Sequence, residues 1–373
     1  MHTVNRRNWL RIMGLAGAAT AAQTLPGIAR AVPEWSQPPV PPTDGPARLS
    51  LNENPYGPST KVREALIQAF DDACRYPSQF TRSIQTIIAK KEGVSPEQVV
   101  LTAGSLEGLK IAGLTFGLYG GEIVSPDPTF HSLMAYAEQF GAHIHHVPLN
   151  KELGHDLEAM EKRVTGNTRL IFVCNPNNPT GTLIPANQMR DFCKAMAGRA
   201  VVFADEAYFD YVTEPGYPSM VELVKQGYNV IVSRTLSKIY GLAGVRVGYL
   251  IAREDIARRL NANSMAGFSV LAVSAAKAAL EDVDFYRFSL QRNAEAKAFT
   301  YELLDDLGLP YVRSHTNFVF FESGKEINAF NAAMLNEQVQ VGRAFPPYAN
   351  WCRVSMGKME DMERFGKALK KLV

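Results

Sequence analysis

The strongest constraint on the fold is a series of short apolar runs that alternate with helical patterns between residues 95 and 250. Strands that alternate with helices in this way indicate an α/β fold with a mostly parallel, doubly wound sheet, covered by helices on both faces. Helical stretches follow most of the runs, for example Leu106–Phe116 and Ala186–Ala197. The seven predicted strands are Val99–Thr102, Glu122–Ser125, Ala142–Val147, Leu170–Val173, Val201–Ala204, Val230–Ser233 and Val245–Leu250.

A second, smaller α+β domain is predicted after Ala252, where the alternation stops. Helical patterns dominate Glu254–Leu307, and two short apolar runs then precede a final amphipathic helix. These later elements are Phe318–Phe321, Cys352–Ser355 and Met359–Leu372, and two helices, Lys61–Cys74 and Ser83–Lys91, are predicted before the sheet. The predicted division is a large domain over 76–265 and a small domain over 266–373, with 49–75 as a separate packing segment.

The N-terminus has the pattern of an export signal. Arg6 and Arg7 stand next to each other before a mild apolar stretch that is too short to span a bilayer, and Ala29-Arg30-Ala31 fits a cleavage site. We predict a twin-arginine signal peptide over residues 1–31 and a periplasmic or otherwise exported protein. The alternative is a cytoplasmic protein with a basic start. Residues 32–48 contain six prolines and are predicted to form an extended arm, outside any core.

Charge and cysteine content exclude several classes of function. The chain has a formal net charge of +2, but residues 1–31 hold four arginines and no acid, so the remainder is slightly acidic. This balance does not favour a nucleic-acid partner. The four cysteines lack zinc-site spacing. His143, His145 and His146 lie on one predicted strand, where alternation sends His146 to the opposite face, so we predict solvated histidines and no metal site.

Polar side chains suited to binding or catalysis follow the predicted strands one after another. Ligands of open α/β sheets bind at the carboxyl ends of the strands, so these residues are expected to converge. Small residues around Gly104 open a helix whose N-terminus can hold a phosphate. Asp205 ends a buried run, where a carboxylate needs a cation. Lys238 lies in the loop between the last two strands, and burial makes a lysine suitable for Schiff-base chemistry.

The whole set matches the requirements of pyridoxal 5′-phosphate (PLP). A lysine can form an imine with its aldehyde, a carboxylate can keep its ring nitrogen protonated, and a helix start can anchor its phosphate. The sequence resembles the fold type I PLP-dependent aminotransferases, and among them the histidinol-phosphate aminotransferase-like branch. The resemblance runs from about Leu49 to the C-terminus. Its motifs are L-N-E-N-P-Y-G-P (51–58), R-Y-P (75–77), T-A-G-S-L-E-G-L (102–109), N-P-N-N-P-T-G (175–181), D-E-A-Y (205–208), T-L-S-K (235–238) and C-R-V-S-M-G (352–357).

The resemblance implies a role for each matching residue. Lys238 would be the imine-forming lysine and proton carrier, Asp205 the partner of the ring nitrogen, and Tyr208 with Asn178 the partners of the ring hydroxyl. The phosphate would be held by Gly104, Ser105, Leu106, Thr235, Ser237 and Arg246, with Tyr76 reaching it from the second subunit of a homodimer. Phe130 would stack on the ring. Substrate would meet Arg353, Asn178, Tyr56, Asn317 and Arg343.

The implied reaction is transfer of an amino group from an amino acid or related amine to a 2-oxo acid. Only Arg343 and Arg353 match the family's substrate-phosphate site clearly, and an exported enzyme fits poorly with histidine biosynthesis, which is a cytoplasmic pathway. We therefore expect an amino acid or related amine, such as an aromatic or imidazole-bearing one, in place of histidinol phosphate itself. A PLP-dependent decarboxylase of the threonine-phosphate decarboxylase type shares most of these motifs. A non-catalytic exported protein that binds the cofactor is the alternative from another class.

Overall fold

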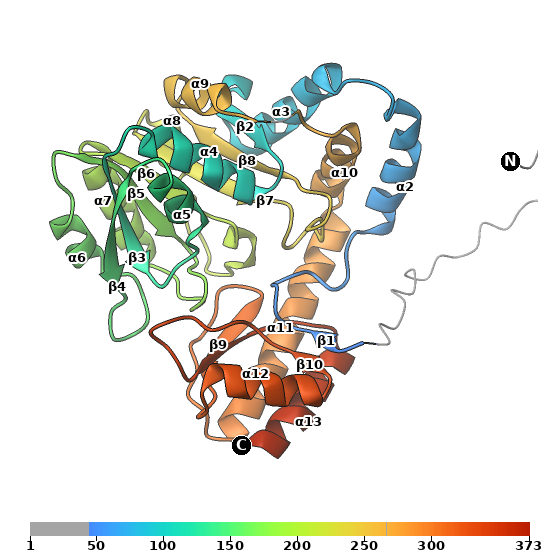
Figure 1. Ribbon diagram of the computed structural model, residues 1–373. Helices are drawn as coiled ribbons and strands as arrows, with labels where there is room; N and C mark the ends of the chain where they lie inside the picture. Colours follow the sequence, from blue (N-terminus) through green and yellow to red (C-terminus); the bar gives the residue numbers. More distant parts are fainter. Residues whose placement is uncertain (1–44, 266) are drawn as a thin grey trace, which may run out of the picture. The chain divides into compact units, whose positions relative to one another are not determined.

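The fold is built around a seven-stranded sheet, seen at the upper left of Figure 1. The structure is a computed structural model that describes residues 45–265 and 267–373. The strand order is β2-β8-β7-β6-β5-β3-β4, and β8 runs antiparallel to the other six strands. The strands are β2 (Val99–Thr102), β3 (Glu122–Asp127), β4 (His143–Pro148), β5 (Thr168–Cys174), β6 (Val201–Asp205), β7 (Val230–Thr235) and β8 (Gly248–Ala252). The predicted α/β class and mostly parallel sheet are confirmed.

Helices cover both faces of this sheet, because successive strand residues point to opposite sides and most are apolar. Leu170 and Phe172 of β5 pack toward one face and Ile171 and Val173 toward the other. The first face is covered by α4 (Ser105–Gly117), α5 (Ser132–Glu138) and α9 (Glu254–Ala262). The second is covered by α3 (Ser78–Glu92), α6 (Leu157–Lys162), α7 (Ala186–Ala197), α8 (Val221–Lys225) and α10 (Val270–Glu281). The predicted doubly wound arrangement is therefore confirmed.

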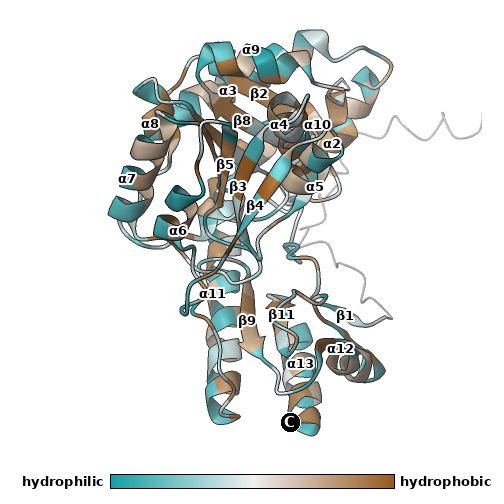
Figure 2. Ribbon diagram, turned by 60° about the vertical axis from the view of Figure 1, so that its left-hand side comes forward, coloured by the Kyte–Doolittle hydropathy of each residue, from teal (hydrophilic) through white to brown (hydrophobic). Residues whose placement is uncertain are grey.

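A separate apolar core belongs to the C-terminal elements, drawn in orange and red in Figure 1. β9 (Phe318–Glu322) pairs antiparallel with β11 (Trp351–Ser355). This pair packs with α11 (Val283–Asp306), α12 (Ile327–Asn336) and α13 (Met359–Leu372). Figure 2 shows apolar residues along β9 and on the inner sides of these helices. The smaller α+β unit predicted from the sequence is present.

The predicted role of residues 32–48 is wrong at its C-terminal end. Ala47–Arg48 form β1, which pairs in parallel with β10 (Val339–Gln340). Ala47 and Leu49 are 1% exposed and belong to the smaller core. This segment therefore pairs with backbone groups of β10 and covers the apolar surface beside it, whereas its composition alone indicates an extended arm. Residues 32–44 lie outside the described part of the chain, as does the predicted signal peptide.

Several boundaries differ from the predictions for local reasons. The last strand of the sheet begins at Gly248 and not at Val245, because Arg246 has a φ of 65° and so forms part of a turn. The first helix, α2 (Thr60–Gln68), ends early and continues as a 3-10 turn over Ala69–Asp72.

Helix α10 packs with α2 and α3 against the larger core. The division at residue 265 stays a prediction. No helix in 45–265 or 267–373 has the length and apolar character to cross a membrane.

Candidate active site

A cavity of about 1000 Å³ lies at the carboxyl ends of the sheet strands and extends to the smaller core. Loops after β2, β3, β5, β6 and β7 contribute to its wall, as does the segment that leads into β8, whose start lies at the same edge. The predicted site residues that line it are Ser105, Leu106, Phe130, Asn178, Asp205, Tyr208, Ser237, Lys238, Arg246, Arg343 and Arg353. The structure thus brings together residues separated by up to 248 positions, as expected for parallel strands.

Lys238 is half-buried in this cavity, in the loop between β7 and β8. Its Nζ donates a hydrogen bond to the Asn52 carbonyl oxygen at 3.0 Å and lies 5.5 Å from the ring centroid of Tyr208. Burial, together with the positive charge of Arg353, lowers the pKa of Lys238 to about 8. The neutral form of the amine, which is the form that can attack an aldehyde, is therefore much more populated near neutral pH than it is in an exposed lysine.

Asp205 ends β6 and is 2% exposed. Its Oδ1 accepts a hydrogen bond from the Ala207 amide at 3.3 Å. Burial raises the pKa of Asp205 to about 7. The carboxyl group is thus placed at the cavity wall in a setting where a cationic ligand would restore its negative charge.

Arg353 joins the two cores at the cavity wall. Its Nη1 donates to the Asn178 Oδ1 at 2.6 Å and its Nη2 to the Ser50 carbonyl oxygen at 2.7 Å. Its Nε is buried and has no hydrogen-bond partner in the structure. Burial lowers the pKa of Arg353 to about 10. A guanidinium held in this way has unused donor capacity for an anionic ligand, which a carboxylate fits well.

Gly104 and Arg246 form the expected cradle at the start of α4. Gly104 has a φ of 77°, and a Cβ at this position would collide with the Arg246 guanidinium. Arg246 donates from Nη2 to the Ala103 carbonyl oxygen at 3.3 Å and from Nη1 to the Ser237 Oγ at 3.4 Å. The start of α4, a serine hydroxyl and a guanidinium therefore lie together, an arrangement that suits the binding of a phosphate.

Besides Gly104 of the cradle, four predicted residues do not line the main cavity. Thr235 is buried behind it and accepts a hydrogen bond from the Ser237 amide at 3.1 Å, so it supports the loop. Asn317 holds the Asn52 carbonyl oxygen at 3.0 Å, and both Asn317 and Tyr56 line a small neighbouring hollow. Tyr56 packs edge-to-face on Phe288. Tyr76 is 91% exposed. The three substrate or cofactor roles assigned to Tyr56, Asn317 and Tyr76 stay predictions.

Asn52 was missed by the sequence analysis, although it lies inside the L-N-E-N-P-Y motif. Its Nδ2 donates to the Tyr208 hydroxyl at 2.9 Å and its Oδ1 accepts from the Ser355 hydroxyl at 2.8 Å. Its φ of 56° is in the left-handed region, which asparagine tolerates better than most residues. Asn52 therefore fixes the phenol of Tyr208 relative to the smaller core.

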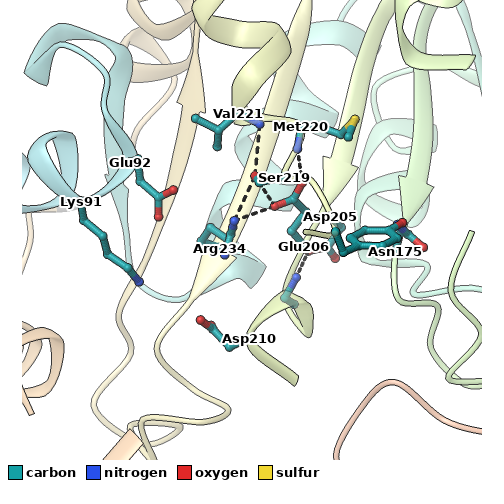
Figure 3. Close-up of polar contacts among 12 residues, drawn as sticks. Lys91, Glu92, Asn175, Asp205, Glu206, Asp210, Ser219, Met220, Val221 and Arg234 are labelled. Carbon is teal, nitrogen blue, oxygen red and sulfur yellow. Dashed lines mark hydrogen bonds and ion pairs between the residues drawn. The ribbon is translucent and has the colours of Figure 1, made fainter. Parts of the chain in front are cut away.

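The sequence analysis also missed a buried ion pair behind the cavity, shown in Figure 3. Glu206 and Arg234 are 3% and 5% exposed, and their side chains meet at 2.8 Å. Glu206 also accepts hydrogen bonds from the Ser219 hydroxyl at 2.8 Å and the Met220 amide at 2.7 Å. Arg234 lies over the ring of Phe209 at 4.1 Å. Because Glu206 follows Asp205 directly, this pair anchors the strand end that carries the catalytic candidate.

Replacing Glu206 with alanine is expected to destabilise the protein by about 3–5 kcal/mol, because Arg234 would stay buried without its directly paired carboxylate. Urea unfolding of the purified variant measures this effect. Glu222→Ala is the matched control, since it breaks a half-exposed arginine pair with Arg190 and should cost at most about 1 kcal/mol. A double variant, Glu206→Leu with Arg234→Met, should recover much of the loss. Equal costs for the two single variants would contradict the account.

The side chains that line the cavity match the chemical groups of PLP. Ser105 and Arg246 of the anion cradle, the Lys238 amine with its lowered pKa and the buried carboxyl group of Asp205 line one cavity. They supply, respectively, a partner for a phosphate, for an aldehyde and for a protonated ring nitrogen. Phe130 lines the same cavity and offers an aromatic face.

The comparison with known families decides the question of identity. The model of the family "Aminotransferase class I and II" matches residues 46–369 of the chain. The chain belongs to this aminotransferase family. Its cofactor is PLP and its reaction is transamination, consistent with the residues of the cavity.

Similar proteins agree with this assignment. A histidinol-phosphate aminotransferase from Moorella thermoacetica is 38% identical over 330 residues, which cover 87% of this chain and 85% of the relative. One from Caldicellulosiruptor saccharolyticus is 34% identical and covers 87% and 91%. The solved structure of histidinol-phosphate aminotransferase from Sinorhizobium meliloti in complex with PLP superimposes with a TM-score of 0.80, at 26% identity, covering 87% of this chain and 91% of that one.

Proposed function

We propose that this aminotransferase takes its amino group from an amino acid or related amine with an aromatic or imidazole side chain and gives it to a 2-oxo acid. The observation that carries the proposal is the composition of the cavity. Arg353 places a cation in the wall for a carboxylate, and Phe130, Val341 and Phe345 supply apolar wall for a flat side chain. The similar proteins named as histidinol-phosphate aminotransferases support an imidazole-bearing donor.

In this proposal the chain's own residues divide the work. Bound PLP supplies an electron sink at the carbon that carries the amino group. Lys238 moves a proton to and from that carbon, Asp205 holds the ring nitrogen in its protonated form, and the cradle at Gly104 and Arg246 anchors the phosphate. Asn178 and Tyr208 bind the ring hydroxyl. Arg353 orients the substrate, and the second cation in the wall, Arg343, offers a site for a further anionic group.

A screen of amino donors tests the substrate class on the PLP-loaded enzyme, with 2-oxoglutarate and pyruvate as acceptors. Aromatic amino acids and histidine are expected to give higher kcat/KM values than aliphatic or acidic donors. Arg353→Lys should raise KM for carboxylate donors by about 10²-fold, because lysine cannot make a bidentate contact. Arg313→Lys is the matched control, since Arg313 lies on the rings of Tyr301 and Tyr311 outside the cavity.

Other results of the same screen would reject the proposal. Release of CO₂ without any requirement for a 2-oxo acid would support the decarboxylase alternative. A best donor with an acidic or short aliphatic side chain would exclude the aromatic or imidazole class. Bound cofactor without turnover of any donor would support a non-catalytic protein.

We also propose a homodimer. Ile67, Phe70, Tyr76 and Met265 are more than 60% exposed, although large apolar side chains are usually covered in a stable protein. A second subunit that covers these side chains would bury them, and in the proposed dimer Tyr76 reaches the phosphate cradle of the neighbouring subunit. Sedimentation equilibrium would show a dimer, and a monomer that binds PLP and turns over substrate would contradict this proposal.

Export through the twin-arginine route is the remaining proposal. It is supported by the paired Arg6 and Arg7 and by the Ala29-Arg30-Ala31 sequence, all outside the described residues. Cell fractionation should find the protein in the periplasm, and a variant with Arg6→Lys and Arg7→Lys should stay in the cytoplasm. Unchanged distribution of that variant would contradict export by this route.

A further inference from the structure

Three side chains from separate elements meet beside the cavity without lining it. Asp127 ends β3, His146 lies on the neighbouring strand β4, and His131 is the residue before the first turn of α5. Figure 1 shows these elements next to each other, and β3 and β4 are paired in the sheet. The His131 Nε2 lies 3.2 Å from the Asp127 Oδ1, and the His146 Nδ1 lies 3.9 Å from the Asp127 Oδ2.

The distances match what a metal ion would need. One nitrogen or oxygen atom from each residue lies within 4.8 Å of the other two. Tetrahedral zinc with bonds of about 2.0–2.1 Å separates its ligand atoms by about 3.3 Å, so small side-chain rotations would close the site. Among the residues in 45–265 and 267–373, this is the one group of three histidine, cysteine or acidic side chains with such spacing.

The chemistry of the three ligands narrows the choice of ion. Two imidazoles and one carboxylate suit zinc better than magnesium or calcium, which prefer oxygen ligands. Each side chain is between 37% and 45% exposed, so an ion can enter and a fourth position remains open to water. His131 does not cap its own helix, so its imidazole is not committed to that role.

We propose that Asp127, His131 and His146 form a zinc-binding site on the surface of the large domain. The site is separate from the cofactor cavity, because none of its three residues lines that cavity. It ties the end of β3 to β4 and to the start of α5. His131 follows Phe130 directly, so zinc would also hold the turn that presents Phe130 to the cavity.

His145 provides a matched control on the same strand. Its Nε2 lies 3.2 Å from a single carboxylate, that of Glu122, and its ring contacts His143 at a centroid distance of 4.7 Å. These neighbours do not complete a group of three ligand atoms. Replacing His145 with alanine therefore removes a strand histidine without touching the proposed ligands.

Calorimetric titration of the PLP-loaded full chain with zinc chloride tests the proposal. We expect binding of one ion per chain that is about tenfold or more weaker in His131→Ala and in His146→Ala, and unchanged in His145→Ala. Zinc should raise the Tm of the wild type and of His145→Ala but not of the double variant His131→Ala with His146→Ala.

Anomalous diffraction at the zinc edge from soaked crystals locates the ion directly. A peak between Asp127, His131 and His146 is the expected result. Equal zinc affinity of the wild type and the double variant, or a peak only at other residues such as the exposed Cys74, would overturn the proposal. Neither readout depends on transaminase activity, so the test of the zinc site is independent of the substrate assignment.

Discussion

Replacing Lys238 with alanine is expected to lower kcat by about 10⁴-fold or more, because the variant loses both the covalent attachment of the cofactor and the proton carrier. Among the described residues that line the cavity, Lys238 is the only lysine. The other basic groups there, Arg246, Arg343 and Arg353, are guanidinium groups that do not form an imine at neutral pH. Steady-state transamination assays with the best donor measure this loss.

Lys297 is the matched control for Lys238. It too is half-buried with a pKa lowered by burial to about 8, but it donates to the Ser314 carbonyl oxygen at 2.9 Å and does not line the cavity. Lys297→Met should keep activity and visible cofactor absorbance, whereas Lys238→Ala should lose both. Lys238→Ala protein with near wild-type turnover would exclude Lys238 from the reaction.

The lowered pKa of Lys238 adds a pH dependence to cofactor uptake. Only the neutral amine attacks the aldehyde, and the neutral fraction rises as pH increases through about 8. Uptake of PLP by cofactor-free protein should therefore accelerate between pH 6 and about pH 8 and level off above it. Stopped-flow absorbance follows this rate directly, and a rate that keeps rising well above pH 8, as for a lysine of ordinary pKa, would contradict the role of burial.

Asp205→Asn is expected to reduce kcat by about 10²–10⁴-fold while the fold is retained. An amide of the same size occupies the space of the carboxyl group but cannot keep a ring nitrogen protonated, so the cofactor withdraws electrons less effectively. Assays of the PLP-loaded variant measure the effect. Asp255→Asn, at an exposed pair with Arg253 at the start of α9, is a control for a general loss of charge. Full activity of Asp205→Asn would remove this residue from the mechanism.

Asp205→Asn should lower the activity but raise the stability of the cofactor-free protein. Burial raises the folded-state pKa of Asp205 from 3.8 to about 7, so the folded chain binds more protons than the unfolded chain between these values. Where the titration of Asp205 alone is considered, the wild type is therefore most stable below pH 4 and loses stability as the pH rises to about 7. At pH 8, Asp205→Asn should be more stable than the wild type by up to about 4 kcal/mol. Urea unfolding at pH 5 and pH 8 separates the two proteins.

The parts of the fold that could be predicted from sequence are those with a local signal. Strands buried on both faces, such as Leu170–Val173, leave continuous apolar runs, and helix α7 was predicted with its observed ends because its apolar spacing is regular. Val245–Val247 carry the same apolar signal but form a turn, because Arg246 adopts a positive φ that places its guanidinium beside Gly104. Hydrophobicity alone does not report such a requirement of the site.

The residues that were missed depend on pairing between distant segments. Glu206 and Arg234 meet because strands β6 and β7 pair with Asp205 opposite Ser233, a register that the sequence does not state. Asn52 reaches Tyr208 across 156 positions, through the contact between the two cores. Arg343 and Arg353 belong to the smaller unit, so their place in the wall of the cavity also depends on contacts between distant segments.

Borohydride reduction tests the central claim most directly. Full-length protein incubated with PLP is reduced, digested and analysed by mass spectrometry, with Lys238→Ala treated in parallel. The account predicts one pyridoxyl-modified peptide, carrying the label on Lys238, and no labelled peptide from the variant. A label on any other lysine in preference to Lys238, or no label in the wild type, would contradict it.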